Sequence, residues 1–183
     1  MVLEHLLSQE RAAILERWFQ LILETYPADS SRFLKQEKDR FTNPVGYTVS
    51  QEIKTLYDEL LQGTNTDKVA TCLDNIIRIR SVQDFLPSQA IAFIFLLKTA
   101  VREKLSTEIG KKGAFEELLK FESRIDKLAL LALDTYMKCR EKLFEIRVDE
   151  VKAERQMALK LLERANLLDR QPELEQDAKH GTV

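Results

Sequence analysis

The stretch PSQAIAFIFLLKTAV, residues 87–101, decides the fold class of this chain. A proline, which suits the first turn of a helix, stands before an almost continuous run of apolar residues. From Ala90 to Val101 this run is apolar on nearly every side of a helix, as is typical of the central helix of a bundle. The sequence therefore predicts an all-α domain built around this segment.

The composition of the whole chain favours the same class. It has 183 residues, of which 44% are hydrophobic and 32% charged, with only five glycines and four prolines. The formal net charge of −2 indicates no basic face, so we expect no nucleic-acid partner. Cys72 and Cys139 are expected to be free thiols in a reducing, cytoplasmic compartment. The N-terminus is not of the signal-peptide type, and no apolar run approaches the about 20 residues that cross a bilayer.

Helix-capping and helix-breaking residues between the apolar segments predict where the other helices begin and end. One helix is expected over residues 3–22, because apolar side chains recur there at three- and four-residue steps. Capping residues, prolines and glycines are typical of helix boundaries further along the chain. The expected boundaries are, in order, Asn43–Pro44, Gly63, Thr66 or Asp67, Pro87 and Gly110.

The last part of the chain predicts one long helix. No proline or glycine occurs from Ala114 until Pro172, and about 55 helical residues would reach about 80 Å. We expect a helical domain over residues 1–140, a helix extension over 141–168 and a disordered tail over 169–183. The domain is expected to be an antiparallel bundle or a globin-like arrangement, with the long C-terminal helix protruding from it.

A heptad pattern in the extension predicts a dimer. Its positions alternate in steps of four and three over about three repeats, which is typical of a coiled-coil seam. Arg155 is the one charged position in this seam and is suited to set its register. The alternative is a single amphipathic helix that lies on its own domain. The seam positions are Phe144, Val148, Val151, Arg155, Ala158, Leu162 and Ala165.

A polar group before the apolar helix is the candidate site. In a structural interpretation, Arg78 and Arg80 occupy the last turn of a helix, where cations are favoured, and Asp84 pairs with one of them. In a functional interpretation, polar side chains line a ligand pocket or a partner-docking patch, with Trp18, Phe41 and Phe85 as walls. Trp18 is either such a wall or plain core. The polar lining would be Arg78, Arg80, Gln83, Asn43 and Tyr47.

The residues that catalysis and metal binding need are scarce. Histidine occurs only as His5 and His180, so we expect no haem, no zinc site and no Ser-His or Cys-His nucleophile. The chain has no Glu-x-x-His pair for a di-iron site and no phosphate-binding glycine loop. We therefore expect a protein that is not an enzyme and that needs no cofactor.

Three stretches carry a resemblance to a known family. ERWFQLILETYP (16–27), DRFTNPVGYTVSQEIKTLYDELLQG (39–63) and IRIRSVQDFLPSQAIAFIFLLK (77–98) resemble the RsbRD N-terminal-domain family. Its members are the helical input modules of RsbT co-antagonist proteins in bacterial stressosomes. The resemblance covers about residues 1–140.

The resemblance implies a sensory or regulatory domain that feeds a signal down its C-terminal helix. Few residues follow Leu168, so we expect a free-standing input domain without an output domain. Such a domain would act as a homodimer and pass its signal to a regulatory protein encoded separately. Two alternatives stay open: a small-molecule binding module with an internal apolar pocket, and a scaffold subunit of a redox or membrane complex.

Overall fold

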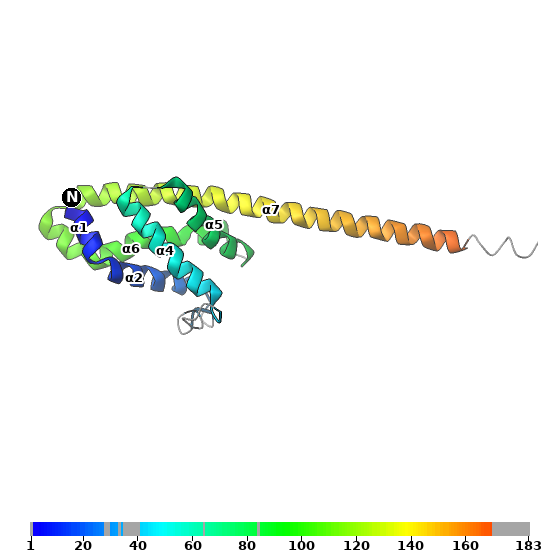
Figure 1. Cartoon of the computed structure of the whole chain (residues 1–183), viewed down its shortest axis with the longest axis horizontal. Helices are drawn as coiled ribbons and strands as arrows, with labels where there is room; N and C mark the ends of the chain where they lie inside the picture. Colours follow the sequence, from blue (N-terminus) through cyan, green and yellow to red (C-terminus); the bar gives the residue numbers. More distant parts are fainter. Residues whose placement is uncertain are drawn as a thin grey trace, which may run out of the picture. The chain divides into compact units, whose positions relative to one another are not determined.

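The described part of the chain is built from α-helices (Figure 1). This computed structural model describes residues 2–27, 30–32, 34, 41–63, 65–83 and 85–169, with only the backbone of 166–169. The described residues contain no strand, and the prediction of an all-α fold with a long C-terminal helix is confirmed. None of the described helices combines the length and the apolar character that crossing a membrane requires. The chain divides into two units, Met1–Arg140 and Glu141–Val183.

The N-terminal segment forms two helices, so the prediction of one continuous helix is wrong. Helix α1 (Val2–Gln9) and helix α2 (Arg11–Glu24) meet at Glu10, whose backbone angles of φ −95° and ψ 14° leave the helical region. The Glu10 amide still donates to Leu6 at 3.0 Å, and its carbonyl accepts from Ile14 at 2.9 Å. The chain therefore bends here while its hydrogen bonds continue.

Local capping sets the starts of the next two helices as expected. Helix α4 (Pro44–Gln62) begins after Asn43, whose side-chain oxygen accepts the Gly46 amide at 2.8 Å, and Gly63 ends it with φ +97°. Helix α5 (Thr66–Val82) begins after Asn65, which caps the next turn in the same way.

Helix α6 (Pro87–Lys112) contains the apolar segment that opens the sequence argument. Its buried side chains include Phe93, Ile94 and Leu97, and they pack mainly against α2. Phe95 is 42% exposed, so the helix is apolar on nearly every side but buried on only part of its surface. The helix passes through Gly110 and ends at Gly113, whose φ of +63° is the left-handed conformation that favours glycine. The expected end at Gly110 is therefore three residues too early.

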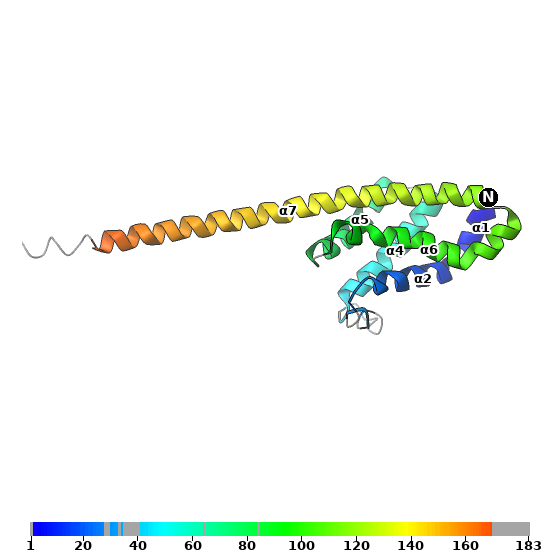
Figure 2. The ribbon, with the colours of Figure 1, turned by 180° about the vertical axis from the view of Figure 1, so that it is seen from behind.

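Helix α7 (Phe115–Asp169) closes the first unit with the part that reaches Arg140. Ion pairs join it to α6, from Lys98 to Asp126 at 2.6 Å and from Arg102 to Glu122 at 2.6 Å. Figures 1 and 2 show this part of α7 running beside α6. Its buried side chains are Leu118, Phe121, Glu122, Ile125, Leu128, Ala129, Ala132 and Tyr136.

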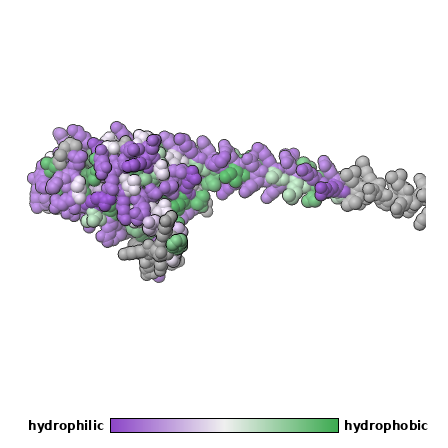
Figure 3. Space-filling model, in the orientation of Figure 1, coloured by the Kyte–Doolittle hydropathy of each residue, from purple (hydrophilic) through white to green (hydrophobic). Residues whose placement is uncertain are grey.

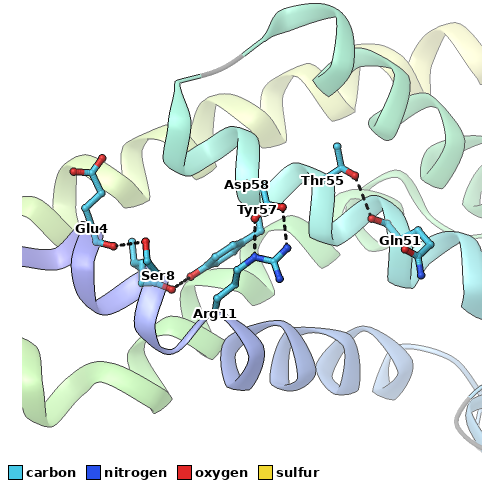
Figure 4. A network of polar contacts seen from close by, with 8 residues as sticks. Glu4, Ser8, Arg11, Gln51, Thr55, Tyr57 and Asp58 are labelled. Carbon is cyan, nitrogen blue, oxygen red and sulfur yellow. Dashed lines mark hydrogen bonds and ion pairs between the residues drawn. The ribbon is translucent and has the colours of Figure 1, made fainter.

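A polar clasp fixes α4 to the corner between α1 and α2 (Figure 4). The buried Tyr57 hydroxyl donates to the Leu7 carbonyl at 2.9 Å, and burial raises the pKa of this phenol. Arg11 donates to both oxygens of Asp58, at 2.7 and 2.8 Å. The clasp holds one end of α4, so the other end, at Asn43, has a fixed position in the bundle.

In the second unit, apolar side chains of α7 are open to solvent. Three positions of the predicted seam, Phe144, Val151 and Leu162, are 61–69% exposed, and Val148 is half-buried. Figure 3 shows hydrophobic patches among hydrophilic residues along this helix. An apolar stripe of this kind is available for a partner helix. Of the predicted tail, 169–183, Asp169 is the last residue of α7, and residues 170–183 lie outside the described residues.

Candidate functional site

The most unusual side chain of the protein is Arg80, in the last turn of α5. It is completely buried, with 0% of its surface exposed, and it ranks among the largest side chains of the core. Arginine is almost never fully buried unless it is paired. A buried arginine therefore raises the question of what balances its charge.

Arg80 uses only part of its hydrogen-bonding capacity. Its Nη2 donates to the Thr25 hydroxyl at 3.0 Å and to the Gln89 carbonyl at 3.3 Å. Its Nε and Nη1 are buried and make no hydrogen bond, and within the described ranges no carboxylate pairs with it. The buried Tyr26 hydroxyl lies near the guanidinium and also has no hydrogen-bond partner there.

Three aromatic rings surround the guanidinium. Its central carbon lies 4.3 Å from the ring centre of Phe85, 5.2 Å from that of Tyr26 and 5.6 Å from that of Phe93. Tyr26 and Phe85 meet edge to face, with ring centres 5.3 Å apart. The negative faces of such rings attract a cation and offset part of the cost of its burial.

Burial is the main cause of the pKa shifts of Arg80 and Tyr26. Burial lowers the pKa of Arg80, and the nearby Tyr26 oxygen partly opposes this shift. Burial likewise raises the pKa of Tyr26. Because arginine stays protonated in proteins, Arg80 keeps its positive charge and Tyr26 remains a neutral hydroxyl donor. The interior therefore holds a positive charge that rings and two oxygen dipoles balance only partly.

A cleft of about 1120 Å³ lies next to this arginine. Two helix N-termini reach it, since Pro44 and Val45 open α4 and Gln89 lies in the first turn of α6. The positive ends of both helix dipoles add to the charge of Arg80. None of its described lining residues carries a charge. They are Thr25, Tyr26, Pro27, Ser30, Leu34, Asn43, Pro44, Val45, Gln83, Phe85 and Gln89.

Three of the residues predicted for the site meet at this cleft. Asn43 and Gln83 line it, and Arg80 lies behind the wall formed by Tyr26 and Phe85. The two stretches that contain Asn43 and Gln83 therefore face one another, as the functional interpretation requires.

The other predicted residues lie elsewhere. Tyr47 lines a neighbouring cleft of about 590 Å³, which shares Asn43 with the first. Trp18 is buried core and donates to the Phe93 carbonyl at 2.7 Å. The side chain of Arg78 is 71% exposed and pairs with Asp74 at 2.7 Å. Phe41 is exposed, and Asp84 lies outside the described residues.

Sequence reasoning missed three residues of the site: Thr25, Tyr26 and Gln89. Tyr26 directly precedes Pro27, two residues after the end of α2, and the residue before a proline is biased away from the helical conformation. Gln89 stands at the third position after Leu86, and its side chain accepts the Leu86 amide at 3.0 Å. This capping role was visible in the sequence as a glutamine two residues after Pro87.

The back of the cleft is bonded to α7. The Tyr136 hydroxyl donates to the Phe85 carbonyl at 3.0 Å, and Arg140 donates to the Ser81 carbonyl at 3.4 Å. Both bonds lie in the first unit and hold the connection between α5 and α6. A change in the position of Phe85 would therefore reach α7 directly.

The part of the chain that the structure describes offers no group of three histidine, cysteine or carboxylate side chains suited to a metal ion. Both cysteines are free, with Cys72 buried and Cys139 half-buried. The site chemistry consists of a buried cation, hydroxyl and amide groups, and apolar walls. These groups are suited to binding.

The described part of the chain is a helical domain with a cleft beside a buried arginine. Residues 12–151 match the family model described as the RsbT co-antagonist protein rsbRD N-terminal domain, and the chain belongs to this family. A relative from Archaeoglobus fulgidus, described as an uncharacterized protein, is 26% identical over 162 residues, which cover 86% of this chain and 95% of the relative. No solved structure matches the chain.

Proposed function

We propose that the chain is a non-enzymatic regulatory input domain of the cytoplasm, which acts through protein contacts. Membership of the rsbRD N-terminal-domain family supports a role in stress-response regulation. In this proposal the cleft near Arg80 receives the signal and α7 passes it on. The output is a change in how the segment 141–165 associates with another chain.

One observation carries the proposal: the hydrogen bond from Tyr136 of α7 to the Phe85 carbonyl at the cleft. Phe85 belongs to the wall of the cleft and also contacts the buried guanidinium of Arg80. An occupant that shifts the backbone at Phe85, and not only its ring, must stretch or break this bond. Coupling between sites requires such an element, which both ends can bias.

The exposed apolar positions of α7 support self-association as the output. Phe144, Val151 and Leu162 follow the heptad pattern and are open to solvent in a single chain. A second copy could cover them in a coiled coil, with Arg155 setting register at some cost in stability.

The relay is tested with Tyr136→Phe, which removes one hydroxyl and keeps the ring. Thr135→Val is the matched control, because the Thr135 hydroxyl bonds only within α7, to Leu131 at 2.9 Å. We expect Tyr136→Phe to raise amide hydrogen exchange at Ser81–Gln83 and Phe85–Leu86 and to shift the dimerisation constant by about two- to tenfold. If exchange rises while the dimerisation constant stays unchanged, the relay is wrong.

Self-association is tested by sedimentation of the full chain over a range of concentrations. Arg155→Leu should strengthen it, and Arg155→Glu, which keeps a charge in the seam, should not. If the wild type and Arg155→Leu both stay monomeric at every concentration, the output is not a homodimer.

A further inference from the structure

We infer that the cleft beside Arg80 binds an organic monocarboxylate, whose carboxylate pairs with the Arg80 guanidinium and the Tyr26 hydroxyl. This inference names the ligand class for the proposed input domain. Binding itself does not depend on whether α7 relays a signal.

The first argument is that three other arginines each pair with a carboxylate, whereas no described carboxylate pairs with Arg80. Arg11, Arg17 and Arg102 each hold both oxygens of a carboxylate, although all three are partly exposed. Arg80 is the most deeply buried of the described arginines, and its charge therefore costs the most to leave unpaired. An anion from outside the chain would provide what the described residues do not.

The second argument is that unsatisfied donors gather at one point. Arg80 Nε, Arg80 Nη1 and the Tyr26 hydroxyl are the buried side-chain atoms without a hydrogen bond in the described structure. These donors belong to two residues that lie side by side in space, since the guanidinium carbon of Arg80 lies 5.2 Å from the Tyr26 ring centre. The Nε–H and Nη1–H bonds point to different sides of the guanidinium, so a carboxylate can accept from one of them with one oxygen and from the Tyr26 hydroxyl with the other.

The charge of the surroundings selects a single negative charge. Arg80 is a full cation bonded to two described lining residues of the cleft, Thr25 and Gln89, and the helix N-termini at Pro44 and Pro87 add only partial charges. Phosphate groups carry more charge and are commonly held by several cations. A monocarboxylate therefore matches the site better than a phosphate.

The walls of the cleft select the rest of the ligand. Rings and prolines, among them Pro27, Pro44 and Phe85, alternate with the amides of Asn43, Gln83 and Gln89. Apolar walls with a few placed polar groups are typical of pockets for small organic molecules. The ligand should thus have a compact apolar body behind its carboxylate.

Access to Arg80 requires a movement of the cleft wall. Four residues that contact Arg80 line the cleft, whereas Arg80 does not, and the edge contact between Tyr26 and Phe85 closes the wall. Phe85 is only half-buried and can turn outward more easily than the buried Tyr26. Binding should therefore separate these two rings.

The test uses the full chain with benzoate and hexanoate as probes and with their neutral amides, benzamide and hexanamide, as controls. Calorimetry measures affinity, and NMR follows the Arg80 Nε–H resonance. We expect binding of at least one acid at millimolar concentration, with a shift of that resonance, and no binding of either amide. Inorganic phosphate should bind more weakly than the acid.

Variants show whether acid binding depends on the buried Arg80 or on an exposed arginine of the same helix. Arg80→Met should weaken acid binding by about 10- to 100-fold, and Tyr26→Phe by about 2- to 10-fold. Arg78→Met is the matched control, because it removes an exposed arginine from the same helix and should leave affinity unchanged. Circular dichroism shows whether each variant folds. If Arg80→Met does not, Tyr26→Phe still decides the result.

Three results would overturn the inference: no probe acid binds, the amides bind as well as the acids, or Arg78→Met weakens binding as much as Arg80→Met. If small acids fail but a peptide with a free C-terminus binds at Arg80, the occupant is a protein tail and the inference is wrong. Acid binding without any change in self-association would keep this inference and contradict the proposed relay.

Discussion

The indole nitrogen of Trp18 lies 2.7 Å from the carbonyl oxygen of Phe93 and donates a hydrogen bond to it inside the core. The bond joins α2 to α6, and the ring of Phe93 in turn lies beside the guanidinium of Arg80. Trp18, the only tryptophan of the chain, therefore lies in the core and is linked to Arg80 through Phe93. Trp18 does not line the cleft beside Arg80.

Replacing Trp18 by Phe should lower the free energy of unfolding by about 1–3 kcal/mol, because the hydrogen bond is lost and a small cavity is left. Urea unfolding followed by circular dichroism measures the change. Phe95→Leu alters an exposed ring on the same partner helix and should change stability by less than about 0.5 kcal/mol. Equal effects of the two substitutions would show that Trp18 contributes no more than a surface residue.

Gly46 is expected to tolerate no side chain. A Cβ atom at this position would lie 2.3 Å from Asn43 Nδ2 and 2.8 Å from Asn43 Oδ1, so the cap of α4 would have to move. Gly46→Ala should lower stability by about 1–2 kcal/mol. Gly110→Ala is the matched control, because nothing lies within 4 Å of its Cβ, and it should raise stability by about 0.5–1 kcal/mol. Thermal unfolding of both variants should give shifts of opposite sign.

Glu59 should make stability depend on pH in the acid range. Its carboxylate accepts a hydrogen bond from the Asn65 backbone N–H at 2.9 Å and pairs with Lys68 at 3.3 Å. The hydrogen bond from Asn65 is the main reason that the pKa of Glu59 is lowered from its usual value of 4.5. Because the folded value lies below the unfolded one, the stabilisation is present above about pH 4.5 and is lost as the pH falls through the folded pKa.

Unfolding of the wild type and of Glu59→Gln at several pH values tests this prediction. The glutamine variant should be less stable at pH 7, and the difference should shrink as the solution is acidified below the usual glutamate pKa. Parallel pH profiles for the two proteins would contradict the assigned role of the carboxylate.

The two cysteines should differ in reactivity. Burial raises the pKa of Cys72 to about 12, with a further contribution from Glu52. Burial also raises the pKa of the less buried Cys139. The thiolate is the reactive form, so at pH 8 Cys72 should react with a disulfide reagent on the order of 1000-fold more slowly than an unperturbed thiol.

Variants that keep only one cysteine show which thiol reacts at which rate. Cys139→Ser leaves only Cys72 and should show the slow reaction, whereas Cys72→Ser should show a faster one. Unfolding in urea should make the rates equal. A fast reaction of folded Cys139→Ser would mean that Cys72 is accessible through local opening.

Helix starts were predictable because they depend on neighbouring residues. Asn43, Asn65 and Pro87 each act within one turn of their own helix, and that chemistry is present in the sequence. The bend at Glu10 was not predictable, because no glycine or proline marks it. Both helices pack against α6, and bonds distant in sequence hold each of them, from Leu3 of α1 to Glu117 of α7 at 2.8 Å and from Trp18 of α2 to Phe93 of α6 at 2.7 Å.

The candidate site was predictable in part for a similar reason. Arg80 lies one turn after the buried Ile76 and Ile77, and Arg78 points to the other side of α5, so helical periodicity separates the two arginines. Tyr26 could not be assigned in this way. It lies 54 positions before Arg80, and the packing of both α2 and α5 against α6 brings it to the guanidinium.

The side-chain amide of Asn43 has two ends with separate partners. Its oxygen accepts the Gly46 amide at the start of α4, while its nitrogen donates to the carbonyl of Leu34, another lining residue of the cleft, at 3.1 Å. An aspartate at this position would keep the acceptor and lose the donor. The start of a helix and the anchoring of the segment before it are therefore separable by a change of one functional group, and the rim of the cleft can be loosened without unwinding α4.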